Sequence, residues 1–481
     1  MKCNYKFRKG TRKGELCNEL NCKQHSTRDN NTMLEKQSSQ EQQLQLQQQQ
    51  QKIVTVSVTI PTDDKNKKLN ELNEKKSNLE KSIKKRLVHE DNIKQKILDL
   101  DTSIENKTSI MKQFLNIKKL DINSTEYYKN QLYIDQALII PWNKYYNIRE
   151  QIGSSSSSLS SSSSSSINSI SQFLQNHTLI KSFIDNIKSE FDKSIYGMEN
   201  IKNEIINYIC KFITNPHSQK NNIALYGSAG VCKTKFIKVL AKALNIPCKI
   251  ISLGGMKDSS YLLGHSQTYQ DSKCGIIVQS IIESQIMNPI LYFDELDKIS
   301  NGELGQDIYS VLSNITDSTI NTNFKDRYFS NLLIDLSKVF YIFTFNDISK
   351  INKVLLDRLN VIYVENPTKK EKLIILKNYC LKELLENIGI INDISFEDRC
   401  YQMIIDYTDK QIDTRISSGI RESTRILEKI LLEINKELLL STTNMNDNII
   451  YYEQFIQYFN KLKSQFIFLN IDNNPPPHMY S

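Results

Sequence analysis

The sequence predicts an α/β protein: a parallel β-sheet with helices on both faces, followed by a small helical domain. From about residue 171, short runs of β-branched and aromatic residues alternate with amphipathic helical stretches, as in parallel sheets. After Pro367 the pattern is helical to about Phe468, which indicates a separate helical unit. The predicted strands are Ile223–Tyr226, Lys249–Leu253, Ile290–Phe293, Val339–Phe345 and Val361–Val364.

The chain has 481 residues, more than one ordinary domain, and its composition changes several times along its length. We expect a small Cys-containing module, a Gln-rich linker, a long helical region, a Ser-rich flexible insert, the α/β core, a helical lid and a tail. In chain order these segments are 1–30, 31–62, 63–150, 151–170, 171–367, 368–468 and 469–481.

The region 63–150 fits a heptad template of apolar residues. One seam comprises Leu69, Ile83, Ile97, Ile104 and Met111, and its companion comprises Leu72, Leu79, Ile93, Leu100 and Phe114. Charged residues interrupt the pattern at Lys76, Arg86, Glu90 and Lys107. We therefore expect a long helix or a helical hairpin that packs on its own domain, and not a long unbroken coiled-coil dimer.

Composition favours a soluble intracellular protein, cytoplasmic and without membrane partners. No apolar run approaches the roughly 20 residues that span a bilayer. The first 30 residues lack the apolar core of a secretory signal. Nine cysteines in such a chain indicate thiols or metal ligands and not disulfides.

Four residues near the N-terminus have the spacing of a zinc site. Cys3, Cys17, Cys22 and His25 form the pattern C-x13-C-x4-C-x2-H, a plausible tetrahedral Cys₃His set for Zn²⁺. The alternative is a disordered basic tail with incidental cysteines. Residues 1–30 carry a net charge of +5, from eight Lys/Arg and three Asp/Glu. This charge suits nucleic acid, but a protein-docking role remains equally open.

A phosphate-binding loop follows the first predicted strand and precedes a helical stretch. Backbone N–H groups of such a loop and of the helix N-terminus point at phosphates. Lys233 supplies a positive charge for the β- and γ-phosphates of a nucleotide, and Thr234 supplies a hydroxyl for Mg²⁺. The loop reads Gly227, Ser228, Ala229, Gly230, Val231, Cys232, Lys233 and Thr234.

Cys232 departs from the usual form of this loop, in which glycine stands immediately before the lysine. A Cβ atom at this position crowds the phosphates or strains the backbone. We therefore expect reduced activity, without loss of the site.

Further along the chain, three candidates complete a site for ATP hydrolysis. The strand Ile290–Phe293 ends in Asp294, which can hold Mg²⁺ through water, and Glu295, which can polarise the attacking water. Asn346 follows the next buried strand and is expected beside the γ-phosphate. Arg358 ends a helical stretch from which it can reach the nucleotide of a neighbouring subunit.

Taken together, these residues resemble an AAA+ ATPase, and specifically the Lon branch of that class. The resemblance covers roughly residues 130–440. From Phe293 to Ile299, around the paired carboxylates, the sequence is nearly the same as in the Lon family. The other matching segments are Ile140–Trp142, Ser194–Met198, Ile251–Gly255, Gly264-His265, Thr268-Tyr269, Phe324, Asp326, Tyr328, Asp335–Val339 and Gly419–Arg421.

The resemblance implies a homo-hexameric ring that unfolds or translocates protein substrates through a central pore. It also implies that Tyr196 and Gly197 hold the adenine, that Arg421 senses the nucleotide from the lid, and that Tyr269 grips the substrate. Gln270 and Asp271 replace the aliphatic residue and the glycine that follow this aromatic in the family.

The sequence does not show the peptidase part of Lon proteases. After Arg421 only 60 residues remain, and the family's Gly-Pro-Ser-Ala-Gly setting is missing. We therefore expect an ATPase that does not cut peptide bonds, with a separate protease or adaptor as an open partner. The alternatives are a nucleotide-binding ring scaffold that hydrolyses little, and an ATPase tethered to nucleic acid by its N-terminal module.

Overall fold

In a computed structural model of the chain, the described residues are 76, 91–154, 176–216, 218, 221–269, 272–300, 302–390, 394–411, 419–440 and 449–466. The chain divides into two units, residues 1–91 and 92–481, and the fold below belongs to the second. The predicted zinc ligands Cys3, Cys17, Cys22 and His25, the Gln-rich linker, the tail and most of the Ser-rich insert lie outside the described residues.

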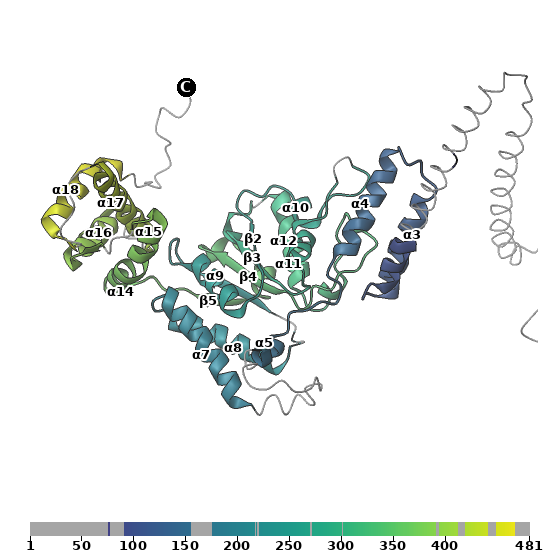
Figure 1. The fold of residues 1–481 in the computed structure, drawn as a ribbon, viewed down its shortest axis with the longest axis horizontal. Coiled ribbons are helices and arrows are strands. Elements are labelled where there is room, and N and C mark those ends of the chain that lie inside the picture. Colours follow the sequence, from purple (N-terminus) through teal and green to yellow (C-terminus); the bar gives the residue numbers. More distant parts are fainter. Residues whose placement is uncertain are drawn as a thin grey trace, which may run out of the picture. The chain divides into compact units, whose positions relative to one another are not determined.

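The central sheet lies among the helices in the middle of Figure 1. It consists of five parallel strands in the order β2-β3-β4-β1-β5. They are β1 (Asn222–Tyr226), β2 (Cys248–Ser252), β3 (Ile290–Asp294), β4 (Phe340–Phe345) and β5 (Asn360–Tyr363). Each strand begins and ends within one residue of its predicted bounds. The parallel pairing confirms the predicted α/β class.

Alternate residues of the strands enter two different cores, because successive side chains of a strand point to opposite faces. In β3, Leu291 and Phe293 belong to one core, while Ile290 and Tyr292 belong to the other. The first core also takes α10 (Ser260–Leu263), α11 (Ile276–Ser284) and α12 (Glu303–Thr316). The second takes α5 (Ile148–Ser154), α7 (His177–Ser194), α8 (Glu199–Thr214) and α9 (Lys233–Leu244).

The helical region before the sheet packs on the first core. Its described helices are residues 92–99, α3 (Ile104–Ile117) and α4 (Thr125–Ile139). Ile93, Ile97 and Phe114 of the predicted seams are buried in that core. The heptad pattern is wrong at Ile104, which is 83% exposed, because the chain leaves the helix after residue 99 and Ser103 caps a new one.

The lid has its own apolar core and more structure than the sequence indicated. Its helices are α14 (Lys369–Ile375), α15 (Leu381–Ile388), α16 (Asp398–Gln411), α17 (Arg421–Leu440) and α18 (Tyr452–Leu462), with a π-helical turn at Leu376–Cys380 (Figure 1). A purely helical lid was expected, but β6 (Ser395–Phe396) and β7 (Ile449–Ile450) form a two-stranded parallel sheet. Strands of two residues are too short to give a sequence pattern.

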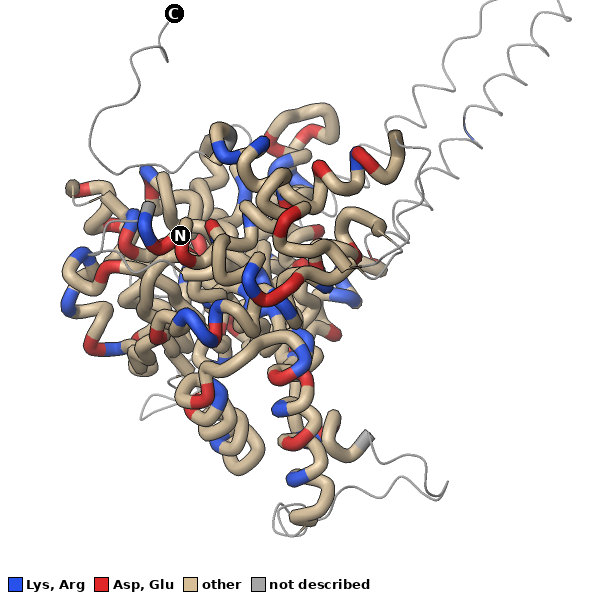
Figure 2. The backbone as a smooth tube through the Cα atoms, turned by 90° about the vertical axis from the view of Figure 1, so that its left-hand side faces the viewer, with Lys and Arg blue, Asp and Glu red and all other residues tan. Residues whose placement is uncertain are grey.

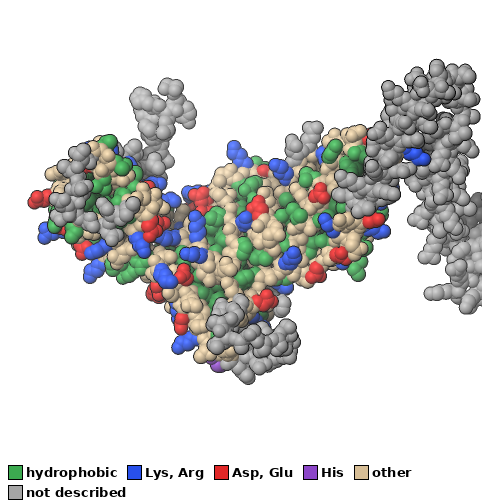
Figure 3. Space-filling model, in the orientation of Figure 1, with side chains coloured by type: hydrophobic (Ala, Val, Ile, Leu, Met, Phe, Trp, Pro, Cys, Tyr) green, Lys and Arg blue, Asp and Glu red, His purple; other side chains and the backbone are tan. Residues whose placement is uncertain are grey.

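Shorter elements complete the described fold. They are α13 (Lys353–Leu356) and the 3₁₀ turns Leu296–Lys298, Asn321–Asn323, Ile348–Lys350 and Lys463–Gln465. Within the described residues, no helix combines the length and apolar character needed to cross a membrane. Basic and acidic residues are interspersed along the described chain (Figure 2), and apolar side chains lie among charged ones on the face shown in Figure 3.

Candidate nucleotide-binding site

The phosphate-binding loop connects β1 to α9, as the sequence predicted, and its lysine closes the loop. Helix α9 begins at Lys233. The Lys233 ammonium donates to the backbone oxygens of Gly227 (2.5 Å) and Ser228 (3.0 Å) and to Oδ1 of Asn346 (2.7 Å). The loop lysine and the amide that follows β4 therefore meet at the carboxyl edge of the sheet.

Burial lowers the pKa of Lys233 to about 8, and the nearby carboxylates of Asp294 and Asp297 oppose this effect. A buried ammonium favours a negatively charged partner, since the low dielectric penalises an uncompensated charge. The structure therefore holds a partly buried ammonium at the phosphate-binding loop.

Cys232 occupies a left-handed backbone conformation, with φ of +64° and ψ of +20°. Residues with a Cβ atom pay roughly 1–2 kcal/mol for this conformation, which glycine adopts freely. Of the two effects expected at this position, backbone strain is therefore present. Burial also raises the pKa of the thiol to about 11, so that it stays protonated at neutral pH.

A row of oxygen atoms joins the end of the loop to the end of β3. The Thr234 hydroxyl lies 3.0 Å from the Tyr292 hydroxyl, which lies 3.1 Å from Oγ1 of Thr344. Thr344 donates to Oδ1 of Asp294 at 2.5 Å. Hydroxyl and carboxylate oxygens are the donors that Mg²⁺ prefers, so Thr234 and Asp294 fit the metal in chemical type.

Glu295 lies beside Asp294, also in a left-handed conformation, with φ of +59°. Its carboxylate packs on the backbone that follows β2, because a Cβ atom added to Gly254 would stand 2.0 Å from Oε2 of Glu295. The residue is exposed. Gly254 therefore makes room for the carboxylate that was predicted to activate water.

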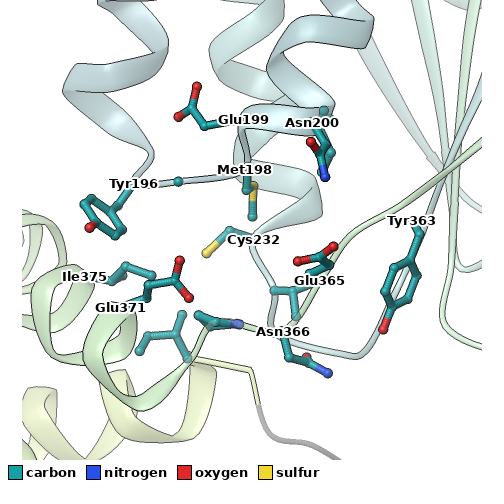
Figure 4. Close-up of a pocket in the computed structure, with 16 residues that line it drawn as sticks. Tyr196, Met198, Glu199, Asn200, Cys232, Tyr363, Glu365, Asn366, Glu371 and Ile375 are labelled. Atoms are coloured by element: carbon teal, nitrogen blue, oxygen red, sulfur yellow. The ribbon is translucent and has the colours of Figure 1, made fainter.

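A cavity between the core and the lid holds the residues predicted for adenine binding. Tyr196 and Gly197 line it from the turn before α8, Cys232 from the phosphate loop, and Glu371 and Ile375 from α14. Figure 4 shows the Cys232 sulfur and the Glu371 carboxylate turned toward the same space. The cavity thus continues the phosphate loop toward the lid.

The lid meets the phosphate loop at the start of α17. The Ile420 N–H donates to the Gly230 oxygen (3.0 Å), and a Cβ atom on Gly230 would stand 3.0 Å from the Cβ atom of Arg421. A Cβ atom on Gly419 would stand only 2.3 Å from Gly230. Two glycines therefore allow this approach, which brings Arg421 to the loop.

Comparisons with known proteins agree with this geometry. Residues 223–366 match the family described as "ATPase family associated with various cellular activities (AAA)". A Lon protease homolog of Acanthamoeba polyphaga mimivirus is 33% identical over 344 residues, which cover 69% of this chain and 30% of that protein. The Lon protease of Campylobacter jejuni is 30% identical over 368 residues, or 76% of this chain and 41% of that protein.

This chain carries a Lon-family AAA+ module. The chain spans less than half the length of these curated relatives. Membership of the AAA family implies ATP and Mg²⁺ as cofactors.

Arg358 of the Lon-family module lies apart from the loop residues. Its guanidinium donates to the Ser313 oxygen (2.8 Å) and pairs with Asp317 (2.8 Å), both near the end of α12. The described residues therefore hold Arg358 by contacts within its own chain, and the nucleotide of a neighbouring subunit would have to compete with Asp317 for it.

Tyr269, the predicted pore residue, is 66% exposed on the segment between α10 and α11. Its backbone oxygen accepts from Lys129 of α4 at 2.9 Å. Gln270 and Asp271, which replace the residues usual in the family, lie outside the described residues.

The buried carboxylate of Asp326 anchors the base of this segment. It accepts from the N–H groups of Gly275 (2.7 Å), Tyr328 (2.8 Å) and Phe329 (3.3 Å). Burial raises the pKa of Asp326 to about 6. In the sequence, Asp326 belongs to the segments that resemble Lon and carries no predicted role.

The sequence reasoning missed Tyr292 and Thr344 as site residues. Both lie in apolar strands. The one signal that could have revealed them is their position on the same face of the sheet as Asp294. Tyr292 precedes Asp294 by two residues, and Thr344 lies two residues beyond Ile342, which pairs with Tyr292. Alternate residues of a strand share a face, so all three side chains point to the side of α9.

Proposed function

We propose that this module hydrolyses ATP and that a homo-hexameric ring of it uses the energy to unfold or translocate protein substrates. The observation that carries the proposal is the meeting of Lys233 with Asn346, 2.7 Å apart, beside the oxygen row from Thr234 to Asp294. Phosphoryl transfer depends mainly on positioning and charge stabilisation, and this edge of the sheet gathers the groups for both.

In the proposed mechanism, the loop N–H groups and Lys233 bind the phosphates of ATP. Thr234 and Asp294 would hold Mg²⁺, which when bound would supply positive charge against the phosphate oxygens. Glu295 accepts a proton from the attacking water, and the Asn346 amide orients that water against the γ-phosphate. Arg421 approaches the phosphates from the lid, and Tyr196 and Gly197 hold the adenine.

Steady-state ATP hydrolysis tests this proposal. We expect Glu295→Gln to lower turnover by about 10²- to 10⁴-fold, because it removes the base while leaving the volume of the side chain unchanged. The variant should still bind ATP, whereas Lys233→Ala should lose binding as well as turnover. Unchanged turnover in both variants would contradict the site assignment.

The proposed role of Tyr269 is to grip the substrate backbone in the pore, which its exposure supports. We expect Tyr269→Ala to keep ATP turnover within about 2-fold and to abolish unfolding of a tagged test protein, because Tyr269 is not among the residues proposed to bind ATP. Lys129→Ala serves as a control that alters the support of the same segment and leaves the aromatic ring in place. Loss of ATP turnover with Tyr269→Ala would argue against a separate gripping role.

A nucleotide-binding ring scaffold with little hydrolysis is the second candidate. The observation in its favour is the strained backbone at Cys232. A third candidate, an ATPase tethered to nucleic acid, depends on residues 1–30, and unchanged DNA binding after their deletion would count against it.

We further propose that the N-terminal module binds Zn²⁺ and that the chain does not cut peptide bonds. Metal analysis before and after chelation tests the first proposal, with about one zinc per chain expected for a four-ligand site. Incubation of the chain with ATP and an unfolded protein tests the second, since new peptide fragments would refute it.

A further inference from the structure

The oxygen row from Thr234 to Asp294 contains a residue with no assigned role. Tyr292 is fully buried in β3, and its hydroxyl lies between the hydroxyls of Thr234 (3.0 Å) and Thr344 (3.1 Å). A phenylalanine would fill the same apolar volume without a polar atom. The hydroxyl of Tyr292 therefore serves these two neighbours and not the packing of the core.

The protons along this row can be assigned, because one end is a carboxylate. The Thr344 hydroxyl donates its single proton to Oδ1 of Asp294. Tyr292 then donates its single proton to the oxygen of Thr344 or to the Asp294 carboxylate, with which its hydroxyl also interacts. The oxygen of Tyr292 in turn accepts the proton of Thr234.

With either acceptor for the Tyr292 proton, the Tyr292 oxygen accepts the proton of Thr234. If Tyr292 donated to Thr234 instead, the oxygens of Tyr292 and Thr344 would face each other 3.1 Å apart with no proton between them. Such a contact is costly in a buried place, where water cannot compensate. The row therefore fixes where the Thr234 proton points.

We propose that Tyr292 is a positioning residue that draws the Thr234 proton away from the Mg²⁺ position, so that the lone pairs of the Thr234 oxygen face the metal. The proposal rests on the proposed function, in which Thr234 binds Mg²⁺ beside ATP. A hydroxyl that binds a cation must offer lone pairs and send its proton elsewhere, and Tyr292 is the acceptor that this chain supplies.

The test is the dependence of nucleotide binding on Mg²⁺, measured by fluorescence titration of the full chain with a fluorescent ADP analogue. The titration is made in EDTA and at rising Mg²⁺ concentrations, so that no turnover is needed. For Tyr292→Phe we expect unchanged affinity in EDTA. The Mg²⁺ concentration that gives half of the maximal increase in nucleotide affinity should rise by about 10-fold, as for other residues that orient metal ligands.

Tyr341→Phe is the matched control. Tyr341 is also a buried tyrosine, in β4, and its hydroxyl donates to the Leu336 oxygen at 3.5 Å. Removing that hydroxyl changes a neighbouring strand without touching the row. This variant should keep the Mg²⁺ dependence of the unaltered protein.

A second pair of variants guards against a simple folding defect. Thr344→Val breaks the row one step further along, and Thr344→Ser keeps its hydroxyl. We expect Thr344→Val to shift the Mg²⁺ dependence in the same direction as Tyr292→Phe. Thr344→Ser should show the Mg²⁺ dependence of the unaltered protein. Melting temperatures of all variants identify any loss of folded protein.

The outcomes separate this proposal from the function on which it rests. If the unaltered chain binds Mg²⁺-nucleotide and Tyr292→Phe shows the same Mg²⁺ dependence as Tyr341→Phe, the positioning role is wrong while the ATPase proposal stands. If the unaltered chain binds no nucleotide with or without Mg²⁺, the proposed function is wrong and the role of Tyr292 falls with it.

Discussion

One loop of this module follows strand β1 and another follows helix α10, and different kinds of contact close them. The phosphate loop after β1 is closed locally, by Lys233 returning to Gly227 and Ser228 only five or six residues earlier. The segment that carries Tyr269 is closed by distant residues. Asp326 comes 51 residues after Gly275, and Lys129 comes 140 residues before Tyr269.

The difference follows from what each loop has to do. A phosphate loop must present backbone N–H groups at a helix N-terminus, which a short motif can accomplish alone. An exposed segment that bears an aromatic residue has few groups of its own to fix it, so the surrounding fold must hold its base. The first kind of loop is visible in a sequence, and the second is not.

The largest effect that we expect concerns Arg358, a third residue held by a distant contact in its own chain, that to Asp317. If Arg358 acts on a neighbour's nucleotide, Arg358→Ala should lower turnover by about 10³-fold. Asp317→Asn, which removes the charge of its in-chain partner, should leave turnover intact. ATP hydrolysis and thermal unfolding of both variants provide the measurement.

Mixing two inactive proteins sharpens this test. A ring of Arg358→Ala and Glu295→Gln subunits contains sites with an intact Glu295 next to an intact Arg358, so partial turnover should return. If mixing restores nothing and both Arg358 variants merely unfold more easily, Arg358 has only a structural role and the long-range contact to Asp317 is its purpose.

The next effect concerns the base of the segment that carries Tyr269. Asp326→Asn should reduce the free energy of unfolding by about 1–3 kcal/mol, because an amide nitrogen would face the N–H group of Gly275. Substrate unfolding should fall more than ATP turnover. Denaturant unfolding followed by fluorescence measures the first quantity, and equal losses of both activities would show that the two loops are not independent.

The same carboxylate predicts a dependence on pH. Burial raises the pKa of Asp326 from 3.8 to about 6, and the backbone N–H groups that donate to it, together with Arg327, oppose this rise only partly. Cys274 and Tyr328 stay neutral in this range, since burial raises the pKa of each to about 12.

The folded state therefore binds a proton more tightly than the unfolded state between pH 3.8 and about 6. Relative to Asp326→Asn, the wild-type protein should become less stable as the pH rises through this window. Above the window, the difference in unfolding free energy between the two proteins should stay constant. The difference between the two unfolding free energies, measured from pH 5 to 7, checks the sign. A difference that grows with pH would contradict the raised pKa.

The smallest effect concerns the strained position in the phosphate loop. Cys232→Gly should change the free energy of unfolding by less than about 1 kcal/mol, because relief of the left-handed strain opposes the lost packing of the thiol against the lid. Turnover distinguishes the two candidate functions. An inactive protein that gains activity in this variant would favour the ring scaffold, and equal activity in both proteins would favour the motor.

Much of the fold could be predicted because apolar runs and glycine positions report local structure. All five strands of the sheet, the loop before α9 and the carboxylates after β3 lie where the sequence indicated. The interruption of the helix before Ser103 and the small sheet of β6 and β7 could not be predicted, because both depend on packing within the folded protein.

By itself, the sequence determined the order of the strands along the chain and the residue types at their carboxyl ends, since each depends on neighbours within a few positions. Only the tertiary structure decided that Tyr292 joins Thr234 to Thr344, that Asp326 holds Gly275 and that Asp317 holds Arg358. Each of these contacts joins residues more than 40 positions apart, and a hydrogen bond requires an approach of about 3 Å. Chain order cannot specify such an approach until the sheet has brought the strand ends together.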